Sequence, residues 1–413
     1  MASAHTRTVA VIGAGAAGLM AAIHAARAGA RVHLFETTRD GGRKILISGG
    51  GRCNILPSVL DPARFVTDSP PRLVRHLLAA WPLEGQREFF ERELELPLVL
   101  EPESGKLFPA SNRARDVRDG LVACAGRSGV ELHFGARVAA VEPAGSGWLV
   151  RAGERGWPAD AVVVTTGGLS VPATGSDGFG LDLARRLDHV VHPTYPALTP
   201  LLADPPVHAD LAGVSLPVVL QARVDGRKVT TRGGFLFTHR GYSGPAVLDI
   251  SHLAVRSRLR GDQPRQAIRV QWTERERDQW EARLRAIGAM SVLSVLREAL
   301  PARLADRLLQ EAGIEPRHQL AQLAREPRQR LLRRLTEYEL PWTGDEGYRK
   351  AEVTGGGVAL DEVQPATLES RRRPGLHFAG EVLDAFGPIG GYNFAWAWVT
   401  GRTAGLGAAG GKR

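Results

Sequence analysis

Short apolar runs and glycines open the chain in the order strand, helix, strand. Val9–Ile12 is an apolar run that predicts a buried strand. The Ala-rich segment Leu19–Ala28 predicts a helix, which Gly29 ends. Arg31–Glu36 predicts a second strand. This order is typical of an α/β fold in which parallel strands are buried on both faces.

The pattern changes twice further along the chain. From about residue 193 to 250, prolines separate short β-like runs, and Glu274–Leu340 has helical spacing with few glycines. After Trp342 the glycine-rich pattern of strands and turns returns, and Tyr392–Gly405 predicts a closing helix. We therefore expect a discontinuous Rossmann-type domain with an inserted β-plus-helical substrate (cap) domain. The expected bounds are 1–192 and 342–413 for the first domain and 193–341 for the insert.

A glycine fingerprint lies between the first strand and the first helix. Gly13 permits a tight turn, Gly15 lets the backbone approach a pyrophosphate, and Gly18 lets the helix pack on the sheet. The helix start, with Ala16 and Ala17, offers free N–H groups and a partial positive charge to phosphates.

Glu36, at the end of the second strand, is the acidic partner of this fingerprint. Its carboxylate would accept hydrogen bonds from ribose hydroxyls and would repel a 2′-phosphate, which disfavours NADP at this site. The fingerprint by itself does not distinguish FAD from NAD.

The composition mainly excludes classes of protein. With 413 residues, 43% hydrophobic and 23% charged, the chain resembles ordinary globular proteins of two domains. No apolar run reaches the ~20 residues that span a bilayer, and the first residues lack the apolar region of a secretory signal. We expect a cytoplasmic protein without membrane segments.

Metal ligands in a familiar spacing are missing from the sequence. The two cysteines, Cys53 and Cys124, form no Cys-x-x-Cys pair, and the neighbouring His189 and His192 have no partner in a known metal motif. We expect no metal.

The net charge of +9 raises the question of an anionic partner. The arginines are scattered, with small clusters at Arg325–Arg334 and Arg371–Arg373. This distribution favours a solvated basic surface, and nucleic acid remains an open alternative.

Four segments in chain order carry a resemblance to a known family. They are Gly41–Asn54, Thr166–Gly178, Phe237–Pro245 and Gly380–Asn393. Together they resemble the signatures of the YhiN/BaiN-like flavoproteins, a family commonly described as NAD(P)/FAD-dependent oxidoreductases. That family is in turn similar to the glutathione-reductase-like and fumarate-reductase-like flavoproteins. The resemblance implies FAD and a discontinuous FAD domain with an inserted domain, in agreement with the pattern changes above.

The resemblance also implies which residues hold FAD. Glu381, after a strand, takes the place of the acidic residue that binds ribityl hydroxyls. The helix opened by Gly390 and Gly391 would point its positive end at the pyrimidine edge of the flavin and stabilise the reduced ring. The full expected set beyond the fingerprint is Arg43, Lys44, Ser48, Gly50, Gly51, Arg52, Cys53, Asn54, Val138, Thr166, Gly167, Gly380, Glu381, Gly390, Gly391, Tyr392 and Asn393.

The electron donor is not defined by any motif. No second Gly-x-Gly-x-x-Gly opens a βαβ unit, because Gly355–Gly357 is too compact and continues as a strand, so NAD(P)H as the donor stays uncertain. The Cys pair of the disulfide reductases is absent, which excludes that class. Cys53 is the one thiol in a motif, and packing is the commoner use of such a residue.

One loop of the insert has the side chains for substrate chemistry. His239, Arg240 and Tyr242 could hold an anionic substrate and supply a proton, and we take them as candidate catalytic residues. The same loop could be a structural turn before a helix that begins near Ser243–Pro245.

Three functions follow from these observations. The leading hypothesis is an FAD-dependent oxidoreductase that transfers a hydride through flavin N5 to or from a small molecule, which could be anionic or unsaturated. The first alternative is a flavin-dependent RNA-modifying enzyme, motivated by the charge and the basic segment Arg325–Arg334. The second alternative is a flavin-binding sensor without turnover.

Overall fold

The chain divides into two compact units in the computed structural model, which describes residues 6–224, 226–285 and 289–411. Unit 1 comprises Met1–Tyr195 and Val353–Arg413, and unit 2 comprises Pro196–Glu352. Unit 2 extends past the expected edge at residue 341, because Gly344–Asp345 pairs with Leu201–Leu202 in its sheet. No helix among the described residues is both long and apolar enough to cross a membrane.

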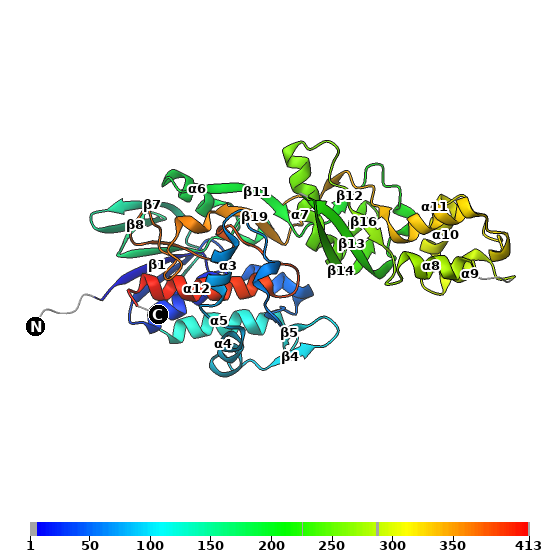
Figure 1. Cartoon of the computed structure of the whole chain (residues 1–413). Coiled ribbons are helices and arrows are strands. Elements are labelled where there is room, and N and C mark those ends of the chain that lie inside the picture. The colour runs from blue at the N-terminus through cyan, green and yellow to red at the C-terminus, as the bar shows by residue number, and fades with distance from the viewer. Residues whose placement is uncertain (1–5, 225, 286–288, 412–413) are drawn as a thin grey trace, which may run out of the picture. The chain divides into compact units, whose positions relative to one another are not determined.

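A five-stranded parallel sheet forms the centre of unit 1 (Figure 1). The strand order is β20-β10-β1-β2-β6, and Val9 pairs with Val32 on one side and Ala161 on the other. The inner strands are buried because both faces are covered, as the apolar runs predict, whereas the edge strand β6 is partly exposed. Their bounds are β1 Thr8–Ile12, β2 Arg31–Glu36, β6 Glu131–Phe134, β10 Ala161–Val164 and β20 Leu376–Phe378. The predicted Rossmann-type α/β fold is confirmed.

Helices and three small antiparallel sheets complete unit 1. The small sheets have the orders β3-β5-β4, β7-β8-β9 and β11-β19. Their strands are β3 Leu56–Pro57, β4 Leu98–Glu101, β5 Lys106–Pro109, β7 Val138–Ala144, β8 Gly147–Ala152, β9 Arg155–Ala159, β11 Val191–Ala197 and β19 Val353–Val358. The helices are α1 Ala16–Arg27, α2 Arg43–Ile47, α3 Pro71–Leu78, α4 Leu83–Glu88, α5 Ala114–Arg127, α6 Phe179–Arg186 and α12 Tyr392–Ala408.

Glycines let the first and last helices of unit 1 pack closely. A Cβ on Gly401 would lie 2.4 Å from the Ala17 carbonyl oxygen, and one on Gly405 would lie 2.2 Å from that of Ala21. The two helices therefore run parallel, with α12 against the helix of the glycine fingerprint. Figure 1 shows this C-terminal helix in the same unit as β1.

Unit 2 contains a seven-stranded sheet and a group of helices around their own apolar core. The strand order is β17-β16-β13-β14-β15-β12-β18. Its strands are β12 Leu201–Leu202, β13 Ser215–Val224, β14 Arg227–Phe237, β15 Gly241–Ser243, β16 Arg269–Gln271, β17 Tyr338–Glu339 and β18 Gly344–Asp345. Its helices are α7 Pro245–Arg260, α8 Arg277–Leu284, α9 Val292–Arg297, α10 Ala302–Glu311 and α11 Arg325–Thr336.

Two local predictions need correction. The β-like pattern was expected to continue to about residue 250, but α7 begins at Pro245, where Gly244 (φ 95°) turns the chain and proline takes the first helical turn. The first helix begins at Ala16 rather than Leu19, inside the glycine fingerprint. The helix start consists of small residues, so the spacing of larger apolar residues does not predict it.

Candidate functional site

Two glycines of the fingerprint are fixed by contact, and the third faces open space. Gly13 (φ 99°) donates its N–H to the Phe35 carbonyl at 2.8 Å, which ties the turn to β2. A Cβ on Gly18 would lie 1.8 Å from the Gly13 carbonyl oxygen. A Cβ on Gly15 would meet no described atom within 4 Å. The backbone at Gly15 is therefore open to a ligand.

The N-terminus of α1 is free to bind an anion. Gly15 precedes the helix, no side chain caps it, and its first turn contains no acidic residue. The N–H groups of Ala16 and Ala17 thus add to the positive end of the helix dipole. This is the arrangement that binds a pyrophosphate.

Glu36 lies beside this helix start. Its Oε2 accepts from the Ala14 N–H at 2.9 Å, and its Oε1 accepts from the Thr38 N–H and hydroxyl, both at 2.7 Å. The Glu36 carbonyl accepts from the Ala136 N–H at 2.9 Å, which brings the start of β7 with Val138 to the same end of the sheet. A carboxylate held in this place suits the ribose of a dinucleotide.

A loop without side chains follows α2. Gly49, Gly50 and Gly51 have φ of 55°, 68° and 87°, a region that favours glycine. A Cβ on Gly50 or Gly51 would meet no described atom within 4 Å. With Ser48, these residues expose a run of backbone along an open surface.

The residues on either side of this loop are less available to a ligand, because they have partners or are buried. Arg43 pairs with Asp40 at 3.0 Å, and Arg52 pairs with Glu101 at 3.1 Å with its guanidinium over the Phe108 ring. Cys53 is buried, and burial raises the pKa of its thiol to about 12. A neutral, buried thiol is a packing residue in this structure.

Asn54 connects this loop to the start of α12. Its amide oxygen can accept from the Gly391 N–H at 3.0 Å while its amide nitrogen donates to the Leu56 carbonyl at 3.2 Å. A Cβ on Gly391 (φ 91°) would lie 2.5 Å from the Leu56 carbonyl carbon. Only glycine therefore allows the helix to begin this close to the loop.

Lys44 and Glu381 form the charged part of the site. Lys44 Nζ lies 2.6 Å from Glu381 Oε2 and 2.6 Å from Ser170 Oγ. Glu381 Oε1 accepts from Ser170 Oγ at 2.6 Å and from the Thr354 N–H at 3.0 Å. A Cβ on the preceding Gly380 would lie 2.8 Å from Ala17 Cβ, so this cluster adjoins the start of α1.

The start of α12 is also uncapped. The Asn54 amide binds the N–H of Gly391, which precedes the helix, but Gly391 has no side chain to cap the first turn, and that turn holds no acidic residue. Asn393 instead closes the preceding loop, bonding the Gly387 N–H and carbonyl at 2.9 Å each. Tyr392 is buried, and its hydroxyl donates to the Val59 carbonyl at 3.0 Å and accepts from Arg64 at 3.2 Å. Asn393 and Tyr392 thus shape the helix start.

The two uncapped helix ends are offset along a common direction. Ala16 begins α1 one residue before Ala17, whereas Tyr392 begins α12 nine residues before Gly401, which packs on Ala17. At 1.5 Å per residue the offset is about 12 Å. FAD carries two distant groups that attract such ends, its pyrophosphate and its reduced ring, so the residues present fit this cofactor.

The remaining expected residues line the end of β10. The Thr166 hydroxyl accepts from the Gly180 N–H at 3.2 Å, and Gly167 has φ 71°. Both follow Thr165, whose hydroxyl donates to the Gly13 carbonyl at 2.8 Å. This segment therefore supports the fingerprint turn from the neighbouring strand.

Two polar residues of this site, Ser170 and Thr354, are not among the candidates predicted from sequence. Ser170 and Thr354 hold Glu381, and Thr354 is a polar residue in the otherwise apolar and glycine-rich β19. Asp384, three residues after Glu381, has a buried Oδ2 that accepts from the Asp68 N–H, from the Thr67 hydroxyl and from Ser69 at 2.7–2.9 Å, and burial raises the pKa of this carboxyl. A lone polar residue beside glycines is the signal that could have identified Thr354.

The three candidate catalytic residues of unit 2 have different surroundings. His239 and Arg240 are exposed in the turn between β14 and β15. Tyr242 is fully buried, and its hydroxyl lies 2.9 Å from His208 Nδ1. Burial raises the pKa of Tyr242 well above its ordinary value. The structure thus separates Tyr242, a core residue, from its two exposed neighbours.

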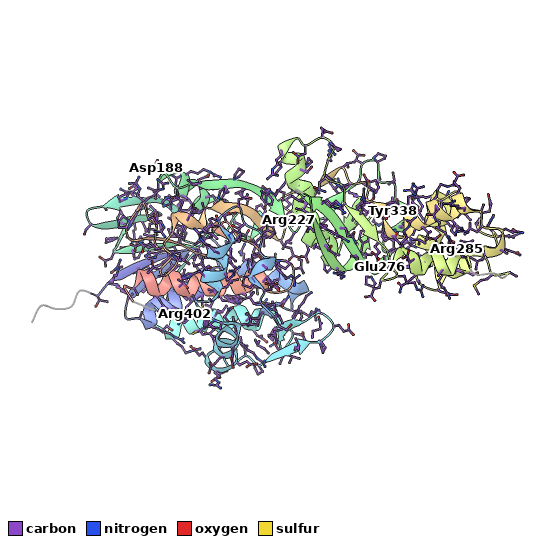
Figure 2. All side chains as sticks on the ribbon, viewed as in Figure 1. Asp188, Arg227, Glu276, Arg285, Tyr338 and Arg402 are labelled. Atoms are coloured by element: carbon purple, nitrogen blue, oxygen red, sulfur yellow. The ribbon has the colours of Figure 1, made fainter. Side chains whose placement is uncertain are left out.

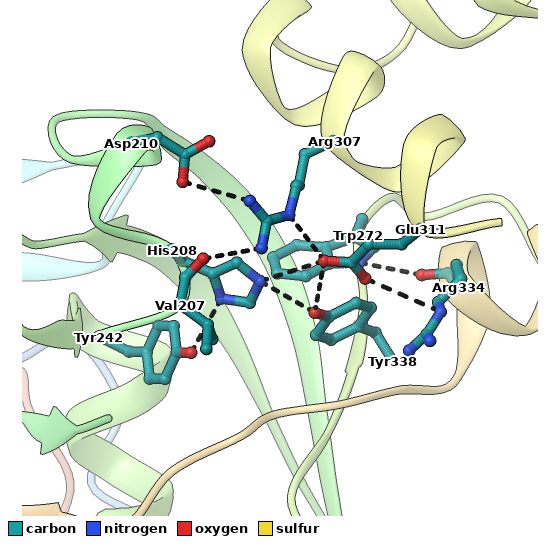
Figure 3. A network of polar contacts seen from close by, with 9 residues as sticks. All are labelled: Val207, His208, Asp210, Tyr242, Trp272, Arg307, Glu311, Arg334 and Tyr338. Carbon is teal, nitrogen blue, oxygen red and sulfur yellow. Dashed lines mark hydrogen bonds and ion pairs between the residues drawn. The ribbon is translucent and has the colours of Figure 1, made fainter. Parts of the chain in front are cut away.

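Tyr242 belongs to a polar network inside unit 2 (Figure 3). His208 Nε2 lies 2.9 Å from the Tyr338 hydroxyl, which in turn lies 3.2 Å from Glu311 Oε1. Arg307 Nε donates to Glu311 Oε1 at 2.9 Å. Burial raises the pKa of Glu311, but the hydrogen bonds from His208, Arg307 and Tyr338 outweigh it and lower the pKa to about 2. Arg307 also bonds the Val207 carbonyl at 2.7 Å, so the groups of the network are satisfied by one another and by their neighbours.

Comparison with known proteins matches this architecture. The model of the HI0933-like protein Rossmann domain matches residues 7–407. A relative from Escherichia coli, ribosomal RNA dihydrouridine synthase, is 35% identical over 94% of each chain. A second, 3-dehydro-bile acid delta(4,6)-reductase of Clostridium scindens, is 32% identical over 97% of this chain and 98% of that protein.

A solved structure agrees at the level of the fold. The Sdh1 complex of Mycobacterium smegmatis, in its apo form, aligns with a TM-score of 0.51 at 17% identity, covering 98% of this chain and 68% of that chain. The match over almost the whole sequence, together with the site described above, establishes the family. The chain belongs to the HI0933-like Rossmann-domain family and is an FAD-dependent flavoprotein oxidoreductase.

Proposed function

We propose that this chain reduces a carbon–carbon double bond conjugated to a carbonyl group. The names of the two relatives support this reaction class. Dihydrouridine is uridine whose ring double bond has gained two hydrogens, and a delta(4,6)-reductase of a 3-dehydro bile acid saturates double bonds of a ketone. Bound FAD, once reduced by an electron donor, would supply the hydride for such a bond.

The chain's own residues would bind FAD and adjust its potential. The observation that carries the proposal is the pair of uncapped helix ends beside the open backbone of Gly15, Gly50 and Gly51. The start of α1 would bind the pyrophosphate, with Glu36 at a ribose. The start of α12 would stabilise negative charge on the reduced ring, which raises the flavin potential. Lys44 adds positive charge beside Glu381.

The charges on one face of the unit 2 sheet help to choose between substrate candidates. Along β13 the residues at even positions from 216 to 222 belong to the apolar core, so the odd positions lie on the opposite face. Arg223 pairs with Lys228 in register, Arg232 pairs with Val219, and Arg269 pairs with Gln221. We call Arg223, Lys228, Arg232 and Arg269 the outer sheet face.

The outer sheet face is positively charged and accessible. All four side chains are exposed, and none has an ion-pair partner among the residues that the structure describes. One acid, Glu339, lies opposite Arg269 in register. Unit 2 as a whole has 25 Lys and Arg against 19 Asp and Glu, whereas unit 1 has 28 against 25. Figure 2 labels two of the arginines of unit 2, Arg227 and Arg285.

These charges favour a polyanionic substrate. A row of cations on a sheet suits the phosphates of a nucleic acid, whereas a single small enone needs no such row. We therefore propose uracil in RNA as the first substrate candidate. A small unsaturated ketone is the second candidate, supported by the Clostridium scindens relative and by the exposed pair His239 and Arg240, which could bind an anionic group.

An acceptor panel tests this proposal. The holoprotein is reduced anaerobically with dithionite, freed of excess reductant, and mixed with an unmodified ribosomal RNA transcript or with a 3-keto-4,6-diene steroid. Mass spectrometry then detects the gain of two hydrogens. Product from RNA supports the first candidate, and product only from the steroid supports the second. Absence of product from both would contradict the reaction class and favour a flavin sensor.

A further inference from the structure

Three potential metal ligands gather at one edge of the parallel sheet. His33 is in β2, and Glu131 and His133 are in the edge strand β6. The two strands are parallel, with His33 opposite Glu131 and Phe35 opposite His133. The three side chains therefore project from one face of the sheet.

The distances between the ligand atoms suit a tetrahedral ion. His33 Nδ1 lies 3.2 Å from His133 Nε2 and 3.3 Å from Glu131 Oε2, and all three atoms lie within 4.8 Å of one another. Zinc bonds of 2.0–2.1 Å at tetrahedral angles place neighbouring ligand atoms about 3.3–3.4 Å apart. One ion could thus reach all three atoms with small side-chain adjustments.

The surroundings prepare these groups to bind a cation. Arg31 holds Glu131 Oε1 through Nε and Nη2 at 3.1 and 3.0 Å, which leaves Oε2 directed toward His33. Burial lowers the pKa of both His33 and His133, because it disfavours the charged form of the imidazole. The rings of Phe35 and Trp157 lie 4.9 and 4.6 Å from that of His133 and restrict its orientation.

We propose that His33, Glu131 and His133 form a site for a divalent transition metal, with Zn²⁺ as the expected ion. Two imidazoles and one carboxylate are borderline ligands that suit zinc and leave a fourth position for water. Glu131 and His133 are half-buried, so an ion can enter from solvent. The metal would tie the edge strand β6 to β2, the strand that ends at Glu36.

The test is metal titration of the full-length holoprotein after dialysis against a chelator. Isothermal titration with ZnCl₂ should give one site, and CoCl₂ should give the visible absorption of tetrahedral cobalt. His133→Ala should remove the cobalt band and weaken Zn²⁺ binding by more than about 100-fold, the upper end for loss of an outer partner of a metal ligand. His76→Ala, which changes an exposed histidine of α3, is the matched control and should bind as the wild type does.

Further variants separate a metal site from a simple histidine pair. Glu131→Gln keeps the shape and should still weaken Zn²⁺ binding, and circular dichroism checks that each variant is folded. Equal Zn²⁺ affinity in the wild type and His133→Ala would overturn the proposal. Absence of a tetrahedral cobalt spectrum in the wild type would overturn it as well, because hydrogen bonds among the three side chains would then account for their geometry.

Discussion

The two units use buried and polar groups in opposite ways. In unit 1, glycines and uncapped helix ends leave backbone donors open, as at Gly15 and Gly50. In unit 2, His208, Glu311 and Tyr338 satisfy one another inside a core. Groups that already satisfy one another have few free donors or acceptors for a ligand. Open backbone is therefore a better guide to a binding site in this chain than a dense polar network.

The largest expected effect comes from a matched pair of glycines in unit 1. Gly18→Ala puts a Cβ 1.8 Å from the Gly13 carbonyl and should cost about 3 kcal/mol of unfolding free energy or more, with loss of FAD. Gly15→Ala has room and an allowed φ of −77°, so the fold should persist.

The same pair distinguishes folding from cofactor binding. Gly15→Ala should lower FAD affinity about tenfold or more, about 1.4 kcal/mol, because the methyl group occupies the approach of the pyrophosphate. Urea unfolding of the apoprotein and fluorescence titration with FAD measure the two quantities. Normal FAD affinity in Gly15→Ala would show that the open backbone at Gly15 is not the cofactor surface.

The second-largest effect is expected in the polar network of unit 2. Glu311→Gln should lower the free energy of unfolding by about 2–3 kcal/mol, because it weakens hydrogen bonds to a charged group, and should leave FAD content unchanged. Since folding lowers the Glu311 pKa from 4.5 to about 2, its contribution is full above pH 4.5 and is lost as the pH falls toward 2. Urea unfolding at pH 6 and pH 3 in both proteins measures this. A variant as stable as the wild type at pH 6 would refute the role of the network.

The third effect concerns the outer sheet face. Lys228→Glu with Arg232→Glu should weaken RNA binding about tenfold or more and reduce the slope of log K against log salt by about 2, one for each phosphate contact. Arg72→Glu with Arg75→Glu makes the same charge change on exposed α3 of unit 1 and is the control. Filter binding at several salt concentrations measures both pairs. Equal losses would mean that net charge alone determines RNA binding.

The smallest effect is expected at Cys53. Because its thiol is buried with a pKa of about 12, it should resist alkylation by iodoacetamide at pH 8 in the native protein. Cys53→Ala should retain FAD and the rate of flavin reoxidation. A large loss of rate with normal FAD content would instead assign the thiol a direct role in the reaction.

Sequence predicts the local parts of unit 1 well because they depend on neighbours in the chain. The strand Val9–Ile12 and the turn at Gly13 follow from apolar runs and glycine spacing. The pairing of Lys44 with Glu381 joins residues 337 positions apart, and the contact of Asn54 with Gly391 spans a similar separation. Such contacts depend on how α12 packs on α1, which no local pattern contains.

In unit 2 the local pattern was a weaker guide. Tyr242, with His239 and Arg240, has the side chains of a reactive loop, yet strand pairing with Leu201 and Phe237 places it in the core. Burial depends on pairing partners far along the chain, whereas the exposed positions of its two neighbours depend on the turn between the strands. The outer sheet face could likewise not be predicted from local sequence, because its cations come from three strands.

The central claim is that electrons stored in the flavin saturate a double bond of the substrate. The most direct measurement is a single turnover without oxygen, in which the reduced holoprotein is mixed with unmodified ribosomal RNA while flavin absorbance and dihydrouridine are followed together. The account predicts one dihydrouridine for each flavin reoxidised, at equal rates. Flavin that stays reduced with RNA and, in a parallel run, with the 3-keto-4,6-diene steroid, or that reoxidises without a saturated product from either, would contradict it.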